Sequence, residues 1–219
     1  MKKFLTVLFL TGLLTASIAA AENSVKTAGT GKAILGISPD KKEITVTAVT
    51  ADGSPVQVEG CTVTELPSDE ETILTATGTK VVLKGNITEL DCSSNELTAL
   101  DVRGLTALQT LDCYNNRLTV LDIHGLSRLA GLYCSRNRLK EHALIQIINS
   151  LPERRTDEET EAVFYTEEDN RSEGNYTDWS SSAGLQAAIK TARAKNWTLY
   201  KQVGEEDFEE LEVVDSVRD

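Results

Sequence analysis

Thiol and carboxylate side chains recur at a fixed interval in the middle of the chain, and these residue types could support chemistry. Cys92, Cys113 and Cys134 stand 21 residues apart, and Asp91 and Asp112 directly precede the first two cysteines. Cysteines of an exported chain can form disulfides or bind zinc, and stacked carboxylates can bind Ca²⁺. Which of these chemistries applies depends on the elements that position the side chains.

Those elements form a sequence repeat of 21 residues. The aligned segments are ITELDCSSNELTALDVRGLTA, LQTLDCYNNRLTVLDIHGLSR and LAGLYCSRNRL. A fixed period in the twenties predicts a solenoid in which each segment forms one coil. Within a coil, the tripeptide LxC predicts a short strand, and the strands of successive coils stack into a parallel sheet. The cysteines then point inward, where other repeats of this kind carry an apolar residue.

The inward position favours buried free thiols over reactive ones. Neighbouring strands lie about 4.8 Å apart, which a disulfide can bridge, but parallel side chains rarely reach its torsion angle. No CxxC pair and no nearby histidine pattern indicates zinc, so no metal site is predicted. We expect each aspartate to accept backbone N–H bonds in its own turn, and a Ca²⁺ site remains the alternative. A structural ladder of asparagines and cysteines is predicted, made of Asn95, Asn116, Asn137, Cys92, Cys113 and Cys134.

The outward side chains beside this ladder form the candidate binding face. They lie on the concave side of the predicted solenoid, and tyrosines among them can supply amphipathic contact area. The predicted face consists of Glu89, Asp91, Ser93, Thr110, Asp112, Tyr114, Tyr133 and Ser135. The alternative is that they are ordinary solvated strand residues.

Segments on both sides of the repeats must close the ends of the solenoid. Alternating apolar residues predict strands near 44–49 and 56–63 and a further pair around the turn 77–79, with an immunoglobulin-like module as the alternative. Beyond the repeats, two helical patterns alternate with two strands, 162–166 and 197–200. The fold class is therefore an α/β solenoid with five segments: signal peptide 1–21, N-terminal β-rich cap 22–82, leucine-rich repeats 83–140, C-terminal strand–helix cap 141–203 and acidic tail 204–219. The tail is expected to be mobile.

The N-terminus indicates export. MKKFLTVLFLTGLLTASIAA combines two lysines, an apolar stretch and a small-residue cleavage site, which is typical of a secretory signal peptide. The predicted location is therefore periplasmic, cell-surface or secreted, with no transmembrane segment in the mature chain. A formal net charge of −12 disfavours nucleic-acid binding.

The segments LDCSSNELTALDV and LDCYNNRLTVLDI resemble the cysteine-bearing leucine-rich repeats of exported proteins from Bacteroidetes-type bacteria, relatives of the internalin-like group. The segment AKNWTLY is similar to the C-terminal cap of that family. This resemblance implies a cell-surface or periplasmic interaction protein, in some cases involved in adhesion.

The predicted function is non-catalytic binding of a protein or glycan ligand through the concave strand face. No GxSxG or HExxH motif is present, and His124 and His142 have no nucleophile at motif spacing. No enzyme activity and no cofactor are expected. The alternatives are a structural subunit of an envelope complex and, less favoured, a carboxylate-dependent hydrolase. The identity of the ligand and the oligomeric state stay open.

Overall fold

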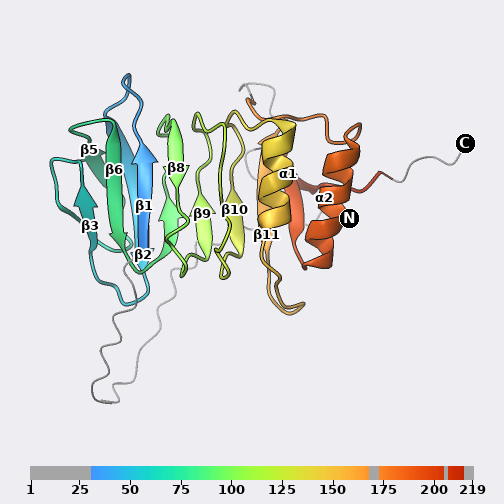
Figure 1. Cartoon of the computed structure of the whole chain (residues 1–219), viewed down its shortest axis with the longest axis horizontal. Helices are drawn as coiled ribbons and strands as arrows, with labels where there is room; N and C mark the ends of the chain where they lie inside the picture. The colour runs from blue at the N-terminus through green and yellow to red at the C-terminus, as the bar shows by residue number, and fades with distance from the viewer. Residues whose placement is uncertain (1–30, 168–172, 205–206, 215–219) are drawn as a thin grey trace, which may run out of the picture.

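The computed structural model describes residues 31–167, 173–204 and 207–214; the predicted signal peptide, residues 1–21, lies outside them. An elongated molecule results, with a β-sandwich at one end and two helices at the other (Figure 1). The strands are β1 (Gly31–Gly36), β2 (Glu43–Thr50), β3 (Val56–Glu59), β4 (Glu65–Leu66), β5 (Thr72–Thr75), β6 (Lys80–Gly85), β7 (Ile87–Asp91), β8 (Ala99–Asp101), β9 (Thr110–Asp112), β10 (Gly131–Tyr133), β11 (Glu161–Thr166), β12 (Thr198–Gln202) and β13 (Phe208–Glu210), and the helices are α1 (Glu141–Ser150) and α2 (Ala183–Ala194).

The larger sheet contains the repeats and has the order β13-β12-β11-β10-β9-β7-β2-β5 among the described residues. Strands β7, β9, β10, β11 and β12 are parallel, and Leu90, Leu111 and Leu132 lie opposite one another. These leucines are buried because every second side chain of a strand points to the same side of a sheet. The stacking is solenoid-like, and each repeat strand ends one residue before its cysteine.

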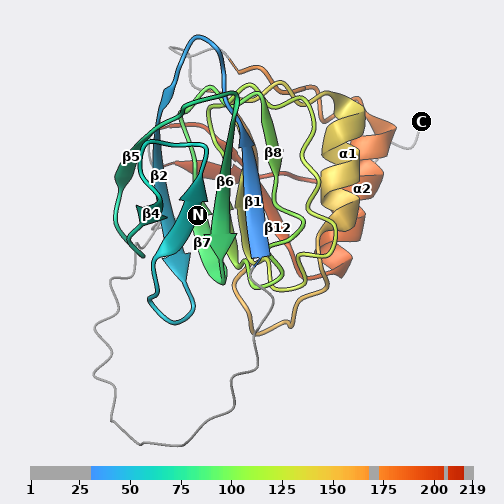
Figure 2. The ribbon, with the colours of Figure 1, turned by 60° about the vertical axis from the view of Figure 1, so that its left-hand side comes forward.

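The N-terminal strands divide between two sheets, and the predicted pairing around the turn 77–79 is wrong. Strand β5 pairs with β2 in the larger sheet, whereas β6 pairs with β1 and β3 in the smaller one. The division places Leu74 of β5 and Leu83 of β6 in one core between the layers, and both are fully buried. Figure 2 shows β2 and β5 in one layer and β6 and β1 in the other.

Both sheets of this sandwich continue into the first repeat without a break. Strand β2 pairs antiparallel with β7, and β1 pairs antiparallel with β8 on the other side of the same coil. The predicted strand at 56–63 is shorter than expected, since β3 ends before Gly60, which has a φ of 83°. The first coil therefore has no exposed apolar end, because the sandwich covers it.

The two helices cover the larger sheet at its other end (Figure 1). Helix α1 buries Leu144 and Ile148, and α2 buries Leu185 and Ile189, at the spacing that the apolar pattern predicts. Ser182 caps α2, because its side chain accepts a hydrogen bond from the N–H of Leu185.

Part of the acidic tail is ordered, so the expectation of a mobile tail is wrong for residues 207–214. Strand β13 pairs antiparallel with β12. Leu211 is 5% exposed, and Arg193 of α2 forms ion pairs with Glu210 and Glu212 at 2.8 and 3.1 Å. Burial of one leucine and pairing of two carboxylates therefore offset the mutual repulsion of the acidic residues.

Candidate binding face

The asparagines of the repeats hold the strands of the face in position. The side-chain amide of Asn116 donates to the carbonyls of Cys92 and Cys113 at 3.0 and 3.1 Å, and its oxygen accepts from the N–H of Leu97 at 2.8 Å. Asn137 repeats this arrangement one coil further on. Each amide thus joins two neighbouring coils through backbone groups that the bend leaves without a strand partner.

A fourth asparagine extends this column, and the sequence repeat does not contain it. The side-chain amide of Asn175 donates to the carbonyls of Cys134 and Phe164 at 2.9 and 2.8 Å, and its oxygen accepts from the N–H of Leu139 at 2.8 Å. Asn175 stands outside the 21-residue period, so sequence spacing could not reveal it. The sequence feature that could have pointed to it is the strand predicted at 162–166. A strand that extends the sheet beyond the third coil must be followed by a turn of its own, where a further asparagine can bond the backbone.

The three cysteines of the repeats are buried and unpaired in the structure, and Cys61 is unpaired and half-buried. Burial raises the pKa of the Cys92 thiol well above its ordinary value, and the nearby Asp112 and Asp91 raise it further. The thiol of Cys92 donates to the carbonyl of Asp112 at 3.4 Å. A protonated, enclosed thiol is a poor nucleophile and a poor metal ligand, so these side chains pack as small apolar groups.

Asp91 and Asp112 lie opposite each other on β7 and β9. Each accepts the backbone N–H of the residue two positions on, Ser93 and Tyr114, both at 2.9 Å. Burial, and secondly the charge of Asp91, raises the pKa of Asp112 to about 7. Asp112 therefore gains and loses its proton near neutral pH.

The second aspartate column, Asp101 and Asp122, lies at the other side of the coils and has a counter-charge. Arg103 donates to both oxygens of Asp101 at 3.0 and 2.8 Å and lies 3.9 Å from Asp122. The Arg103 guanidinium holds the pKa of Asp101 below its ordinary value. No described basic side chain forms such a pair with Asp91 or Asp112.

The remaining predicted face residues differ in exposure. Glu89 is exposed, Thr110 and Tyr114 are half-buried, and the guanidinium of Arg136 lies 5.3 Å above the Tyr114 ring centre. Ser135 is only 2% exposed, so its prediction as a surface contact is wrong. The segment 173–175 lies against the chain next to Ser135 and excludes solvent there.

Glu173 anchors that segment. Its carboxylate accepts backbone N–H bonds from Arg136 and Thr166, and from Gly174 and Asn175 in its own turn, at 2.8–3.0 Å. A carboxylate with several N–H partners is held strongly, since charge-assisted hydrogen bonds exceed neutral ones in strength. This carboxylate and Asn175 together close the loop over the third coil.

Tyr133 lines a groove of about 1030 Å³ on the same face. In register it stands between Asp112 and Val163, and Val163 stands beside Tyr200 of β12. The hydroxyl of Tyr133 donates to Glu161. The residues that line the groove include Thr110 and Tyr133, which were predicted, and others that the sequence analysis missed, among them Gly131, Glu161, Arg193, Thr198, Tyr200, Glu210 and Glu212. Alternation along the two predicted strands would have identified Glu161 and Tyr200.

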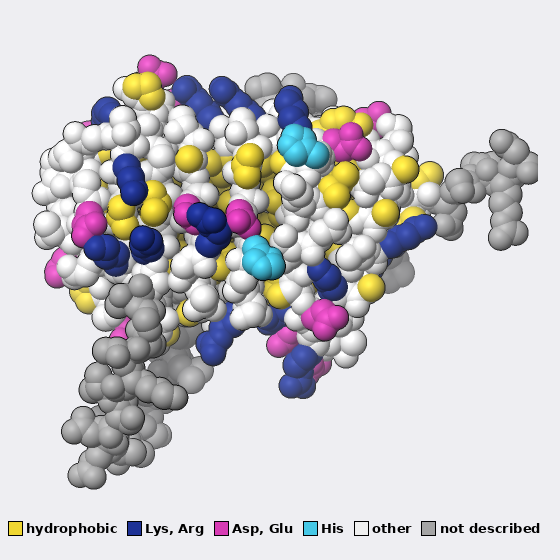
Figure 3. Space-filling view, in the orientation of Figure 1, with side chains coloured by type: hydrophobic (Ala, Val, Ile, Leu, Met, Phe, Trp, Pro, Cys, Tyr) yellow, Lys and Arg dark blue, Asp and Glu magenta, His cyan; other side chains and the backbone are white. Residues whose placement is uncertain are grey.

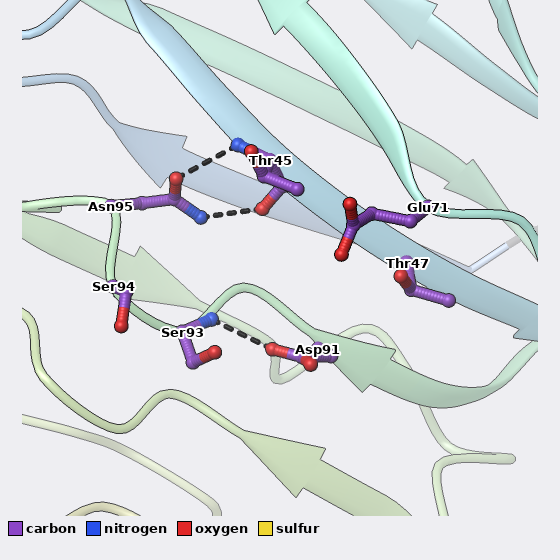
Figure 4. A pocket seen from close by; sticks show the side chains of 7 residues that line it. All are labelled: Thr45, Thr47, Glu71, Asp91, Ser93, Ser94 and Asn95. Carbon is purple, nitrogen blue, oxygen red and sulfur yellow. Dashed lines mark hydrogen bonds between the residues drawn. The ribbon is translucent and has the colours of Figure 1, made fainter.

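A smaller pocket of about 180 Å³ lies on the same face toward the sandwich (Figure 4). Its lining is polar throughout and joins β2 and β7 with the segment before β5. The lining residues are Thr45, Thr47, Glu71, Asp91, Ser93, Ser94 and Asn95. The outward face of the larger sheet, with this pocket and the groove, is called the strand face below.

Stacked parallel strands joined by an asparagine column are the geometry of a leucine-rich repeat. Residues 85–127 match the family model described as leucine-rich repeats in two copies, which supports a leucine-rich repeat protein. Domains of this kind generally mediate protein–protein interaction. No curated protein and no solved structure matches the chain.

Two further findings concern the described residues alone. None of the helices in this part of the chain combines the length and the apolar character needed to cross a membrane. The same residues contain no group of three or more histidine, cysteine, aspartate or glutamate side chains arranged to hold a metal ion.

Proposed function

We propose that this chain is an exported, non-catalytic binding module whose strand face binds a partner protein. The observation that carries the proposal is the groove of about 1030 Å³ across β9–β12, in which Tyr133 and Tyr200 flank Val163. Tyrosine combines a broad apolar ring with one polar atom, which suits the centre of a protein interface.

The surroundings of Tyr133 support a preformed contact. Its hydroxyl is bonded to Glu161, so the ring has few alternative orientations. A Cβ at Gly131 would come 3.3 Å from the Thr110 side chain, which is a tight contact, and 3.6 Å from the Tyr133 ring, which is an ordinary one, so Gly131 and Thr110 pack closely beside Tyr133. A side chain that is already ordered loses little conformational entropy when a partner binds.

The polar groups of the face support binding more than catalysis. Asp91 and Asp112 each hold a backbone N–H, and the cysteines behind them are enclosed. Export rests on the lysines, apolar stretch and small residues at positions 1–21. The class of partner is a protein exposed in the same compartment.

The proposal can be tested by capturing partners from an envelope extract of the source organism and measuring the affinity of the identified protein. Tyr133→Ala/Tyr200→Ala should weaken binding at least about ten-fold, which corresponds to about 1.4 kcal/mol. Val120→Ala removes a 60% exposed side chain and serves as the control.

Unchanged affinity in the double variant would place the contact away from the strand face. A glycan array run with the same proteins covers the other ligand class. Glycan binding that depends on Tyr133 and Tyr200, without a protein partner, would replace the proposal with a lectin-like one.

A further inference from the structure

We infer that the polar pocket beside Asp91 receives a lysine or arginine side chain, so that the partner of the strand face presents a basic segment. This inference rests on the proposed function, because it assigns the chemistry of the protein that the strand face binds. Three observations carry it: the charge of the sheet face, the lining of the pocket and an apolar side chain at its rim.

Several carboxylates of the sheet face around the pocket form no ion pair among the described residues, and the ammonium of Lys41 near the pocket is bonded to the backbone carbonyl of Ser94 at 2.7 Å. Strands β2, β5, β7, β9, β10 and β11 contain no lysine and no arginine. Within the described residues, no ion pair is formed by Glu71, Glu89, Asp91, Asp112 or Glu161. Unpaired carboxylates on this part of the sheet attract a partner of the opposite charge and set its orientation.

The opposite face of the molecule differs in charge. Figure 3 shows lysine and arginine side chains over β6, β1 and β8. Lys84 pairs there with Glu59 at 2.5 Å, and Arg103 pairs with Asp101 at 2.8 Å. Those two carboxylates are therefore neutralised within the chain, whereas Glu71, Asp91 and Asp112 on the strand face form no ion pair among the described residues. At the far end of the groove, Glu210 and Glu212 are paired with Arg193.

The pocket offers hydrogen-bond acceptors that the protein itself leaves available. Glu71 and Asp91 approach it from opposite sides, one from before β5 and the other from β7 (Figure 4). The Asn95 amide is engaged with both backbone groups of Thr45 at 2.6 and 2.8 Å, and the Ser93 N–H takes one oxygen of Asp91. The other oxygen of Asp91 and the Glu71 carboxylate remain available.

The size and ligand count of the pocket suit an organic cation. A volume of about 180 Å³ holds an ammonium or guanidinium group with a few waters, at roughly 30 Å³ per water. A guanidinium has N–H donors on two sides, so it can donate hydrogen bonds to two carboxylates at once. Calcium takes six to eight oxygen ligands, usually with more carboxylates, and no group of three metal-binding side chains occurs in the described part of the chain.

An apolar surface lies next to the pocket where the stem of such a side chain would pass. Ile73 stands opposite Thr45 in the sheet and is 65% exposed. Lysine and arginine lay their methylene groups along apolar surface and keep the charged end in a polar site. The same residue types that bind the head group would therefore also contact Ile73.

The second basic position of the partner follows from strand spacing. Asp91 on β7 and Glu161 on β11 are separated by three steps between strands and by two residues along the strands, roughly 16 Å in all, which four residues of extended chain and the reach of two arginine side chains cover. The peptide Ac-Arg-Ala-Ala-Ala-Arg-amide presents two guanidinium groups at this separation. Its analogue with citrulline in place of arginine keeps the shape and removes the charge.

The experiment titrates both peptides into the isotopically labelled mature protein and follows backbone amide shifts by NMR. The arginine peptide should shift the amides of Thr47, Asp91 and Ser93, and the citrulline peptide should not. Glu71→Gln/Asp91→Asn should weaken the arginine peptide about five-fold or more. Asp52→Asn/Glu65→Gln removes two carboxylates away from the strand face and should bind like the wild type.

Equal weakening in both double variants would mean non-specific attraction and would overturn the inference. Saturable shifts of the same amides with CaCl₂ alone, competing with the peptide, would replace it with a cation site. Partner binding that is lost in the tyrosine variant but kept in Glu71→Gln/Asp91→Asn would refute the basic subsite and leave the proposed function standing. Partner binding kept in both variants would refute the two together.

Discussion

Asn175 stands beside Asn137 as Asn137 stands beside Asn116, although 38 residues separate the first two in the chain and 21 the second two. Asn137 bonds the carbonyl of Cys113 and the N–H of Leu118, and Asn175 bonds the carbonyl of Cys134 and the N–H of Leu139. The asparagine column therefore continues into the C-terminal segment by tertiary contact, where the sequence repeat has ended.

Asn175→Ala should destabilise the protein by about 2–4 kcal/mol, because it leaves the Phe164 carbonyl and the buried N–H of Leu139 without partners and removes one of the two amide donors to the Cys134 carbonyl. Urea unfolding would measure the loss. Asn149→Ala, on an exposed position of α1, is the control and should change stability by less than about 0.5 kcal/mol. Equal effects of the two substitutions would show that the fourth amide does not support the fold.

Asp112→Asn should stabilise the protein above neutral pH. The pKa of Asp112 is about 7 in the folded protein, and the ordinary value of 3.8 applies to the unfolded chain. As the pH falls, the folded state therefore takes up the proton before the unfolded state does. The wild type therefore gains stability from about pH 8 down to about pH 4, and the ionised form carries the penalty. The amide oxygen can still accept the N–H of Tyr114.

The expected gain of Asp112→Asn is about 1–2 kcal/mol at pH 8 and falls toward zero near pH 4, as urea unfolding at several pH values would record. Asp52→Asn is the control, since the Asp52 carboxylate is exposed and its pKa is lowered by Ser54. A gain of the same size at every pH would contradict the shifted titration of Asp112.

Glu173→Gln should loosen the segment over the third coil. The carboxylate accepts four backbone N–H groups, and a carboxamide has only one acceptor oxygen. We expect a loss of about 1–3 kcal/mol and faster amide hydrogen exchange at Arg136 and Thr166. Glu159→Gln, at an exposed position, should leave both amides protected. Unchanged exchange in Glu173→Gln would mean that other contacts hold the segment.

The four cysteines should titrate as free thiols in denaturant without reductant. In the folded protein, Cys61 should react with a thiol-reactive disulfide reagent well before Cys92, Cys113 and Cys134, because it is only half-buried. Mass spectrometry of the labelled protein, followed by proteolysis, would assign the order. Fewer than four thiols in denaturant would mean that a disulfide forms.

Local pattern was sufficient wherever a side chain's role depends on its own strand. The period of 21 residues indicated the parallel strands, and alternation indicated that Leu90, Leu111 and Leu132 point inward. The asparagine side chains donate to backbone carbonyls and the aspartate side chains accept from backbone N–H groups, and in both cases the partners lie in the same or the next coil.

The assignment of β5 and β6 to two different sheets was beyond sequence reasoning, because two neighbouring segments of the chain could pair with each other or with distant strands. The alternation of β5 and β6 is the same in either case, and only the shared core around Leu74 and Leu83 decides that they face each other from two sheets. The prediction that Ser135 is accessible was wrong for a related reason. Its strand position points outward, but the segment at Glu173 covers it.

The sequence alone therefore determined the repeat, the inward leucines and cysteines, and the strands that carry Asp91, Asp112 and Tyr133, because these follow from short-range periodicity. Tertiary structure alone decided which outward residues stay accessible and which meet. It placed Glu71 across from Asp91, Glu161 against Tyr133, and Asn175 after Asn137. Such contacts join residues far apart in the chain, and their geometry depends on how whole layers pack.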